Sequence, residues 1–389
     1  MRCHHFDAGT CRSCTLLDVP HARQIDNAQA ALIDLLTPFG GTPDAWDAPV
    51  TSADAHFRAK VKMVVAGSAA APILTLPRKP GETATTPPDL VDCPLYPREV
   101  GVLLEHVRGL IRRAQVPPYD VDRRRGEAKG VIVTIAPSGP MMLRLVLRTE
   151  AALDRIREHL PALLDAQPAV VSVSANIHPE PVASLEGPTE IPLAGSEVLE
   201  LESGPVLLLP RARSFIQTNT AVAGQLYAQV GAWIDDIAST HEHALRIWDL
   251  YCGLGGFALA CAGPDREVTG IEVSAPAIDS ARESARRMGV EARFEAADAT
   301  AWAAGQPSPP DVVIVNPPRR GIGPELAAWI EGSGMRDVVY SSCNPATLAA
   351  DLAAMPSLRI VRGRLIDMFP HTRHDEVVVR LRRNGGADD

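Results

Sequence analysis

A cysteine stands where a strand is expected to end, and its surroundings favour a reactive thiol. The run 336–340, which ends in Val-Val-Tyr, is predicted to be a strand, and residues 341–345 after it are Ser-Ser-Cys-Asn-Pro. Asn344 and Pro345 are typical of the first residues of a helix. A thiol near a helix N-terminus has a lowered pKa and is more often a thiolate. We therefore predict that Cys343 is a nucleophile, the alternative being a buried structural cysteine.

A glycine-rich turn lies upstream of this cysteine. Residues 249–257 read Asp-Leu-Tyr-Cys-Gly-Leu-Gly-Gly-Phe and follow a predicted strand over 245–250. Glycines let the backbone approach a ligand closely. Glu272 ends the next predicted strand, where a carboxylate can accept both ribose hydroxyls of a nucleoside. The spacing departs from that of dinucleotide-binding loops and resembles the S-adenosylmethionine (AdoMet) loop of Rossmann-like methyltransferases; a turn that serves only the fold is the alternative.

A methyl donor beside a nucleophilic thiol indicates methylation of a carbon that is first activated covalently. Thiolate addition to C6 of a uracil ring makes C5 able to attack a methyl group, and a base must then remove the C5 proton. Residues 369–376 read Phe-Pro-His-Thr-Arg-His-Asp-Glu at the next strand boundary. Glu376 is the predicted base. His371 and His374 could orient it, or could be merely packed or solvated.

The turn after the predicted strand 311–315 bears on the kind of methylation. Residues 316–321 read Asn-Pro-Pro-Arg-Arg-Gly. Asn-Pro-Pro is typical of methyltransferases, and amino-methyltransferases of nucleic acids place next an aromatic residue that stacks on the flipped base. Arg319 stands in that place, which weakens the case for nitrogen methylation and suits contact with phosphate or base edges. An ordinary solvated pair of arginines, Arg319 and Arg320, is the alternative.

Four of the seven cysteines are expected to hold a metal centre. Cys3, Cys11 and Cys14 form a C-x7-C-x2-C pattern, and Cys93, followed by proline, is a plausible fourth ligand. Disulfides are improbable in a reducing cytosol. Structural zinc usually takes two close pairs of ligands, whereas iron–sulfur clusters tolerate uneven spacing. We predict a [4Fe–4S] cluster with a structural role; zinc and unligated thiols are the alternatives.

The elements that must position these residues fall into two parts. From residue 205 strands and helices alternate, which is typical of a doubly wound parallel sheet whose strand ends bind ligands. Residues 1–204 show strand-like runs over 61–65, 131–135 and 141–147, the last with the partial alternation of a half-solvated antiparallel strand. The sequence thus predicts an α/β protein with an N-terminal α+β domain, 1–204, and a catalytic domain, 205–389.

Composition sets the outer limits. The chain has 389 residues, 46% hydrophobic and 22% charged, with a formal net charge of −9. This length predicts two or three domains. Because no apolar run approaches the roughly 18 residues of a spanning helix and the N-terminus lacks an apolar signal segment, we expect a cytoplasmic protein without membrane contact. We also expect a monomer with no obligate protein partner.

Together the motifs resemble those of the bacterial RNA uracil-C5 methyltransferases, which make 5-methyluridine. The resemblance covers nearly the whole chain, including Ser-Phe-Ile-Gln-Thr-Asn at 214–219. It implies a Rossmann-like class I AdoMet methyltransferase domain preceded by an iron–sulfur and RNA-recognition domain. The site residues that it implies are Gln217, Tyr251, Glu272 and Asn316 for AdoMet, Cys343 as nucleophile, Glu376 as base, and Cys3, Cys11, Cys14 and Cys93 for [4Fe–4S].

Within the family the chain is most similar to enzymes that modify uridine 747 of 23S rRNA. The cysteine pattern begins too early for the N-terminal barrel of the enzymes acting on uridine 1939, and the tRNA enzymes for position 54 usually lack the cluster. Asn316 also replaces an aspartate common elsewhere in the family. The predicted function is AdoMet-dependent methylation of uracil C5 in 23S rRNA. The alternatives are another 23S rRNA site or a tRNA, an amino-methyltransferase of nucleic acid, and a non-catalytic RNA-binding factor.

RNA contacts are expected from local basic patches, since the chain as a whole is acidic. The candidates are Arg58, Lys60, Lys62, Arg108, Arg112, Arg113, Arg123, Arg124, Arg125, Lys129, Arg211 and Arg213. Such side chains neutralise phosphates and give salt-dependent affinity; a solvated surface is the alternative. The target uridine would have to be flipped out or lie in a loop.

Overall fold

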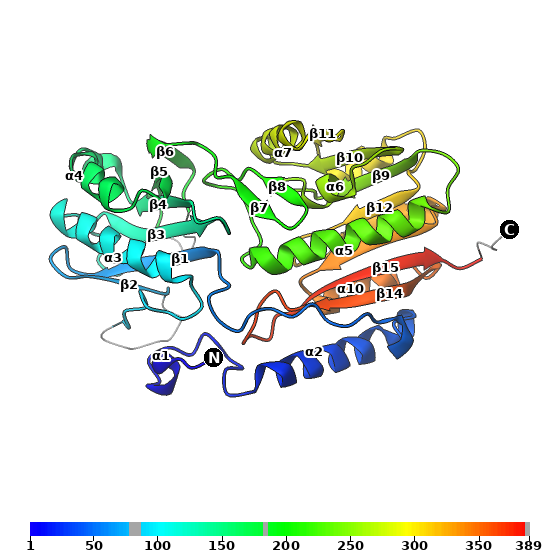
Figure 1. Cartoon of the computed structure of the whole chain (residues 1–389), viewed down its shortest axis with the longest axis horizontal. Coiled ribbons are helices and arrows are strands. Elements are labelled where there is room, and N and C mark those ends of the chain that lie inside the picture. Colours follow the sequence, from blue (N-terminus) through cyan, green and yellow to red (C-terminus); the bar gives the residue numbers. More distant parts are fainter. Residues whose placement is uncertain (78–86, 182–185, 386–389) are drawn as a thin grey trace.

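The computed structural model describes residues 1–77, 87–181 and 186–385. Its strands form a six-stranded sheet, a seven-stranded sheet and a two-stranded ribbon between them (Figure 1). The ribbon consists of β7 (Leu201–Ser203) and β8 (Val206–Leu208). Each large sheet has its own apolar core.

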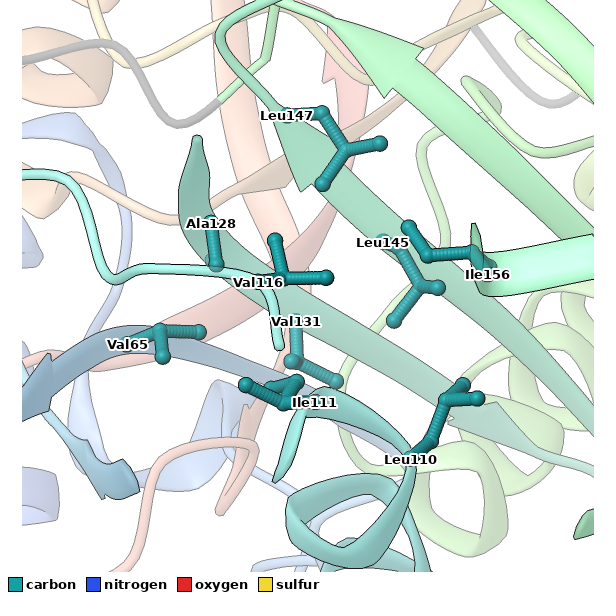
Figure 2. A pocket seen from close by; sticks show the side chains of 10 residues that line it. Val65, Leu110, Ile111, Val116, Ala128, Val131, Leu145, Leu147 and Ile156 are labelled. Carbon is teal, nitrogen blue, oxygen red and sulfur yellow. The ribbon is translucent and has the colours of Figure 1, made fainter. Parts of the chain in front are cut away.

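The six-stranded sheet has the order β2-β1-β3-β4-β5-β6. Its strands are β1 (Lys60–Gly67), β2 (Pro72–Thr75), β3 (Ala128–Ile135), β4 (Met141–Leu147), β5 (Val170–Ile177) and β6 (Thr189–Gly195). Neighbours are antiparallel except β4 and β5. The helices α3 (Arg98–Arg113) and α4 (Leu153–Ala166), the latter after a 3-10 turn over Glu150–Ala152, pack on one face. The hollow between them and the sheet is lined by apolar side chains, so it is a gap in the core rather than a catalytic pocket (Figure 2).

The prediction that β4 is half-solvated was wrong. Every residue of β4 is buried, and Arg144, the polar residue in the strand, is only 1% exposed. Its guanidinium pairs with Glu186 at 2.8 Å and with Glu190 at 2.6 Å. A charged side chain can be buried when it is paired. The polar residue that suggested a solvated strand face therefore forms a buried ion pair instead.

The seven-stranded sheet has the order β11-β10-β9-β12-β13-β15-β14. Its strands are β9 (Leu245–Leu250), β10 (Arg266–Glu272), β11 (Arg293–Ala296), β12 (Val312–Val315), β13 (Asp337–Ser342), β14 (Leu358–Ile366) and β15 (Glu376–Arg383). The first five in this order are parallel, whereas β15 runs antiparallel to both β13 and β14. Strand order reverses at β9, the switch point where open α/β sheets bind ligands.

Helices cover both faces of this sheet. They are α5 (Thr220–Ala238), α6 (Gly256–Cys261), α7 (Ala275–Met288), α8 (Ala299–Ala304), α9 (Gly323–Gly332) and α10 (Pro345–Ala353). Alternate residues of β12 face opposite sides: Val312 and Ile314 pack with α5, α6 and α7, while Val313 and Val315 pack with α8, α9 and α10. The predicted doubly wound sheet is confirmed, with an antiparallel hairpin added at one edge.

The N-terminal segment crosses to this second unit. It contains α1 (His4–Asp7), α2 (His21–Leu36) and short 3-10 turns at Thr37–Phe39 and Pro43–Ala45. Helix α2 runs beneath β14 and α10 (Figure 1), and Leu32 and Leu36 are buried in the core of the seven-stranded sheet. Part of the predicted domain 1–204 therefore packs with the C-terminal sheet, and the boundary itself stays a prediction. Among the described residues, no helix is long and apolar enough to cross a bilayer.

Candidate active site at the carboxyl edge of the seven-stranded sheet

The glycine-rich turn after β9 is held in a conformation that exposes its backbone. Tyr251, Gly253 and Gly255 have φ angles of 65°, 55° and 83°, in the left-handed region. A Cβ on Gly255 would lie 2.9 Å from the Phe294 ring, so only glycine fits there. A Cβ on Gly253 would meet nothing within 4 Å. The turn therefore presents an open face at Gly253, as a backbone site for a ligand requires.

Two carboxylates support this turn. Asp249 is fully buried; its Oδ2 accepts the Ala258 N–H at 2.9 Å, and its Oδ1 has no protein partner among the described residues. Burial raises the pKa of Asp249 to about 8. Glu272, at the end of β10, accepts the N–H of Gly253 at 3.3 Å and that of Ser274 at 3.0 Å. Since a carboxylate has about four acceptor positions, Glu272 keeps capacity for the two hydroxyls of a ribose.

The other predicted AdoMet contacts come from neighbouring elements. Asn316 follows β12, and its N–H donates to the carbonyl of Leu250 at the start of the turn, at 3.4 Å. Gln217 lies in the segment before α5, where the carbonyl of the next residue, Thr218, accepts the Ala59 N–H at 2.7 Å. Both side chains are half-buried. The assignment of Gln217, Tyr251, Glu272 and Asn316 to AdoMet stays a prediction that this arrangement fits.

Two exposed apolar side chains near predicted AdoMet contacts in the sequence were not singled out from the sequence. Val273 follows Glu272 and is 76% exposed, and Phe215, two residues before Gln217, is also 76% exposed. Large apolar side chains exposed beside a polar site are typical of surfaces that cover a flat ring. Their signal in the sequence was only an apolar residue next to a flagged polar one.

Cys343 directly follows β13, and Asn344 caps α10 by accepting the Ala346 N–H at 3.3 Å. The thiol is half-buried. The pKa of Cys343 is raised, first by burial and then by the charge of Glu376, whereas the hydrogen-bonded Arg319 guanidinium lowers it. The predicted net lowering of the thiol pKa was therefore wrong, because burial and a neighbouring carboxylate raise this pKa by more than Arg319 lowers it. Cys252 and Cys261, at 7% and 0% exposure, pack in the core of the sheet.

Glu376 begins β15 and reaches the same edge because β15 is antiparallel to β13. Ser342 pairs with Val377 in the register of the two strands, so Glu376 lies beside the end of β13. The side chain is 1% exposed, and its Oε1 accepts the Ser341 Oγ–H at 2.7 Å. Burial raises the pKa of Glu376 to about 7, and the Ser341 hydroxyl opposes that rise. A carboxylate poised near neutral pH suits a general base.

The turn 316–322 is tied to α10, the helix that follows the thiol. The carbonyl of Arg319 accepts hydrogen bonds from Asn344 Nδ2 at 3.0 Å and Thr347 Oγ1 at 3.2 Å. Asp351 Oδ2 accepts the Ile322 N–H at 3.0 Å and the Tyr340 hydroxyl at 2.6 Å. These contacts fix the Arg319 backbone against α10 and so set where its guanidinium meets the thiol.

The two flagged histidines differ. His371 is 2% exposed and bonds to Gln24 and to the Asp54 carbonyl. His374 is exposed, with its ring centroid 6.3 Å from that of Phe369. The hydrogen bond that Glu376 accepts comes from Ser341, a residue that the sequence did not single out. The sequence carried no local signal for this contact, because only the antiparallel pairing of β13 and β15 brings the two residues together.

The four predicted cluster ligands meet in one place. All are free thiols; Cys3 is buried, and Cys11, Cys14 and Cys93 are half-buried. The pKa of Cys14 is raised to about 12, mainly by burial and then by the charges of Cys93, Cys11 and Cys3. Burial likewise raises the pKa of Cys93 to about 11. Burial and the repulsion between neighbouring thiolates disfavour the charged form of these cysteines, and bound metal ions would stabilise it.

The spacing of these thiols bears on the kind of centre. Four thiolates around zinc lie about 3.8 Å apart, given Zn–S bonds of about 2.3 Å in a tetrahedron. Among the described residues, the one group of three or more potential ligands whose donor atoms all lie within 4.8 Å of one another is His4, His5 and Asp92. No three of the four cysteine sulfur atoms all lie within 4.8 Å of one another. A larger iron–sulfur cluster fits this donor set.

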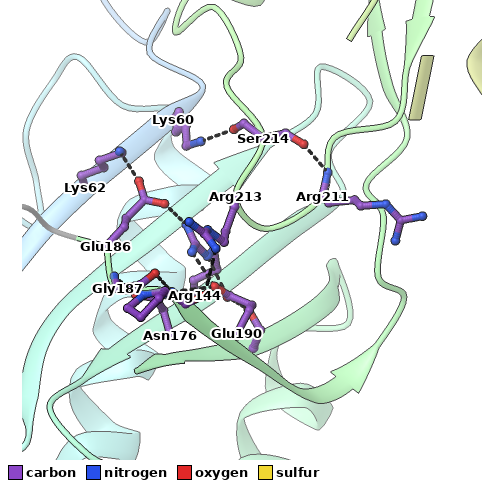
Figure 3. A network of polar contacts seen from close by, with 12 residues as sticks. Lys60, Lys62, Arg144, Asn176, Glu186, Gly187, Glu190, Arg211, Arg213 and Ser214 are labelled. Atoms are coloured by element: carbon purple, nitrogen blue, oxygen red, sulfur yellow. Dashed lines mark hydrogen bonds and ion pairs between the residues drawn. The ribbon is translucent and has the colours of Figure 1, made fainter. Parts of the chain in front are cut away.

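Several of the predicted RNA-binding residues are occupied within the protein. Lys62 pairs with Glu186 at 2.5 Å, Arg211 with Glu197 at 2.8 Å and Arg108 with Glu105 at 2.6 Å. Lys60 is 8% exposed and donates to the Ser214 carbonyl, and Lys129 donates to the His178 and Glu180 carbonyls. Figure 3 shows the Lys60–Ser214 bond, which joins β1 to the segment before α5, together with the Lys62–Glu186 pair. These five residues therefore have partners within the protein, whereas Arg112, Arg113, Arg123, Arg124 and Arg125 are exposed. The phosphate contacts stay a prediction.

Comparisons with known proteins agree with this geometry. A family model described as tRNA (Uracil-5-)-methyltransferase matches residues 309–384, and one described as Methyltransferase small domain matches residues 234–327. The Shewanella amazonensis protein 23S rRNA (uracil(747)-C(5))-methyltransferase RlmC is 45% identical over 98% of this chain and 97% of its own length. Proteins of the same name from Vibrio cholerae and Escherichia coli are each 43% identical over 98% of this chain and 100% and 99% of theirs.

A solved structure shows the same architecture. The tRNA (uracil-54, C5)-methyltransferase of Pyrococcus abyssi, in complex with S-adenosyl-L-homocysteine, is similar with a TM-score of 0.77 and 22% identity. The match covers 95% of this chain and 84% of that one. At this identity the likeness shows the fold alone: a class I AdoMet methyltransferase fold with mixed α/β sheets.

Proposed function

The chain belongs to the family of 23S rRNA (uracil(747)-C(5))-methyltransferases, and we propose that it methylates C5 of uridine 747 in 23S rRNA from AdoMet. The observation that carries the chemistry is that Cys343 and Glu376 share one sheet edge with the glycine-rich turn and that the charge of Glu376 acts on the Cys343 thiol. An enzyme with this substrate would work in the cytoplasm.

Cys343 is the proposed nucleophile. Its thiolate adds to C6 of the uracil, and the electron pair of the C5–C6 double bond moves towards O4, which makes C5 nucleophilic. Arg319 favours the thiolate, because its guanidinium is the one neighbour that lowers the pKa of this thiol through both charge and hydrogen bonding. AdoMet supplies the methyl group that C5 takes.

Glu376 is the proposed base that completes the reaction. After methylation C5 carries both a methyl group and a proton, and the Glu376 carboxylate takes that proton. The C5–C6 double bond then forms again and the Cys343 sulfur leaves. The pKa of about 7 allows Glu376 to be ionised in a large fraction of molecules at neutral pH while remaining a strong enough base.

The methyl donor is expected on the open face of the glycine-rich turn. Glu272 would bind the ribose hydroxyls, Val273 would cover the adenine, and Asn316, Tyr251 and Gln217 would complete the contacts. Three observations support this placement: the free space at Gly253, the spare acceptor capacity of Glu272, and the exposed apolar surface of Val273.

We further propose that Cys3, Cys11, Cys14 and Cys93 hold a [4Fe–4S] cluster with a structural role. In this proposal residues 1–204 form the cluster-binding and RNA-recognition domain, and residues 205–389 form the catalytic domain. The convergence of four free thiols from separate turns supports the cluster.

The proposed function is tested with 23S rRNA transcripts that carry tritium at C5 of uracil. The purified protein with AdoMet should release tritium and incorporate methyl groups in equal amounts, at the uridine numbered 747. Release from another 23S rRNA uridine or from tRNA would overturn the site but keep the chemistry. Methyl incorporation without tritium release would favour an amino-methyltransferase, and binding without either signal would favour an RNA-binding factor.

A further inference from the structure

His371 is held entirely by residues from the N-terminal part of the chain. Its N–H donates to Gln24 Oε1 at 3.0 Å, and its carbonyl accepts the Leu16 N–H at 3.0 Å. In the ring, Nδ1 lies 3.2 Å from Gln24 Nε2, and Nε2 lies 2.7 Å from the Asp54 carbonyl. All four polar groups of this residue are thus bound by residues more than 300 positions away in sequence.

These contacts define the state of the ring. A carbonyl only accepts hydrogen bonds, so Nε2 must carry the proton that it shares with Asp54. Nδ1 faces the Gln24 amide nitrogen, which cannot accept a hydrogen bond, so Nδ1 carries no proton. The imidazole is neutral, and burial lowers the pKa of His371, which agrees with this assignment. Protonation at Nδ1 would set one donor against another, so His371 serves here as a fixed connector.

Gln24 is the other half of the contact. It lies on α2, is 9% exposed, and its Nε2 also donates to the carbonyls of Leu16 at 2.9 Å and Val19 at 2.8 Å. One side chain therefore binds both the segment that follows Cys14 and the loop that contains His371. Replacing it with an apolar residue would leave several buried polar groups unpaired.

His371 also has a backbone conformation that needs support. Its φ of 65° lies in the left-handed region, which a residue with a Cβ seldom adopts. Such conformations persist where the surroundings over-determine them and are common at functional sites. The loop from β14 to β15 turns at this residue and delivers Glu376, five positions further on, as the first residue of β15.

A second contact holds the start of the same loop. Asp367 Oδ2 lies 2.7 Å from Nε2 of His21, the first residue of α2, and accepts the Ser52 N–H at 3.0 Å. Ser52 Oγ in turn accepts the Asn219 side-chain amide at 2.7 Å, two residues after Gln217. The loop bearing the base and the segment bearing a predicted AdoMet contact are therefore both attached to the N-terminal part of the chain.

We propose that Gln24 and His371 form a positioning clamp, through which the cysteine-bearing N-terminal segment sets the place of the loop 367–375 and hence of the Glu376 carboxylate. The proposal rests on the proposed function of Glu376 as the base. Gln24 and His371 touch neither substrate nor thiol in this role; they act through the loop. The step that depends on them is removal of the C5 proton, because that step requires Glu376 within hydrogen-bond reach of C5.

The test uses the full-length protein with its metal centre and an RNA transcript labelled with tritium at C5. Two quantities are followed in a single turnover: the covalent protein–RNA adduct that survives denaturing gel electrophoresis, and released tritium. Gln24→Ala should form the adduct at a rate near that of the native protein and release tritium about 10- to 100-fold more slowly. The adduct should therefore accumulate, while the KM for AdoMet stays within about twofold.

Gln29→Ala is the matched control, since Gln29 lies on the same helix and the substitution has the same effect on helix propensity. It should behave as the native protein does. Parallel loss of adduct formation and tritium release in Gln24→Ala, or no change in either, would overturn the clamp. A native protein that forms no adduct and releases no tritium would instead overturn the proposed function.

A second pair of variants keeps the test decisive if Gln24→Ala folds poorly. Asparagine tolerates the left-handed region, so His371→Asn keeps the backbone conformation and the two backbone bonds to Leu16 and Gln24 and should retain more activity than His371→Ala. In a double-mutant cycle, Gln24→Ala combined with His371→Ala should be no slower than the slower single variant. Rate losses that multiply would show that the two residues act independently and would overturn the clamp.

Discussion

The Ser341 hydroxyl donates a 2.7 Å hydrogen bond to Oε1 of Glu376, across the antiparallel pair β13 and β15. Both side chains are buried, at 0% and 1% exposure. The bond stabilises the charged form of a carboxylate that burial otherwise disfavours, and the pKa of Glu376 is about 7 as a result of these opposing effects. The pair therefore controls how much of the base is ionised at neutral pH.

Ser341→Ala should weaken catalysis at neutral pH and leave it less affected at high pH. Loss of the hydroxyl raises the pKa of Glu376 further, so a smaller fraction is ionised at pH 7. A hydrogen bond to a charged group contributes about 1.5–3 kcal/mol, so we expect the acidic limb of the kcat profile to move up by about one pH unit or more. The dependence of kcat on pH measures this shift. Ser342→Ala is the control, because the Ser342 hydroxyl bonds with Asn344; an equal shift in both variants would contradict the prediction.

Glu376→Gln should abolish proton removal yet stabilise the fold above neutral pH. The folded pKa of about 7 exceeds the ordinary 4.5, so the folded protein binds more protons than the unfolded chain between these values. Stability is therefore lost as pH rises from about 4.5 to 7, by on the order of 3 kcal/mol. Glutamine carries no charge and avoids this loss. Thermal unfolding at pH 5 and pH 8 checks it: the variant should gain only at pH 8, and an equal difference at both pH values would contradict the buried charge.

Arg319→Gln should make the Cys343 thiol less reactive. The guanidinium lowers the pKa of this thiol through charge and a hydrogen bond, so its removal leaves less thiolate at any pH. We expect iodoacetamide to alkylate the peptide that contains Cys343 about three- to tenfold more slowly at pH 8. Arg320→Gln is the matched control, since Arg320 acts electrostatically on Tyr251. Unchanged alkylation in Arg319→Gln would show that Arg319 does not activate the thiol. Cys343→Ala should form no covalent protein–RNA adduct.

Gly321→Ala and Gly323→Ala separate backbone conformation from steric fit. Their φ angles are 81° and 78°, so both alanines meet the same left-handed penalty of about 1–2 kcal/mol. A Cβ at Gly321 would also lie 2.3 Å from Asp351 Oδ2, whereas at Gly323 it would meet nothing within 4 Å. We expect Gly321→Ala to lose more stability and, because the turn carries Arg319, more kcat. Equal effects in thermal unfolding and in kcat would show that the Asp351 contact does not hold the turn.

The cysteine quartet should bind iron and sulfide. Protein purified without oxygen should contain about four iron and four sulfide per chain, as a [4Fe–4S] cluster requires. Cys14→Ser should lose both iron and sulfide, because the cluster loses a ligand. It should also unfold at a lower temperature, because the fold loses the stabilisation that the cluster provides. Cys261→Ala, which removes a packed thiol outside the quartet, should keep its iron. Zinc in place of iron, at one per chain, would contradict the cluster.

The sequence by itself determined the elements with regular patterns and the residues at their ends. Strand β12 is apolar throughout, β9 and β13 contain buried apolar residues, and turn residues follow these strands and β10. Both the doubly wound sheet and the positions of Glu272, Asn316 and Cys343 were therefore readable. Local rules suffice there because parallel strands place all their carboxyl ends at one edge.

The sequence of helix α2 indicates a helix but not its place in the fold. Ile25, Ala28, Leu32 and Leu36 recur at helical spacing, which is a readable signal for a helix. That this helix packs under β14 in the C-terminal unit was not readable, because chain order gives no information on which of two cores a linked helix joins.

Tertiary structure alone decided the chemical state of the site. Burial raises the pKa of both Cys343 and Glu376, the charge of Glu376 raises that of Cys343 further, and the Ser341 hydroxyl lowers that of Glu376. These contacts arise only when β15 pairs antiparallel to β13. Arg144, Lys62 and Lys60 read as available charges but are committed to partners far along the chain. Residue type fixes which reaction a side chain can perform, whereas the dielectric, the partners and the distances that govern it come from contacts between distant segments.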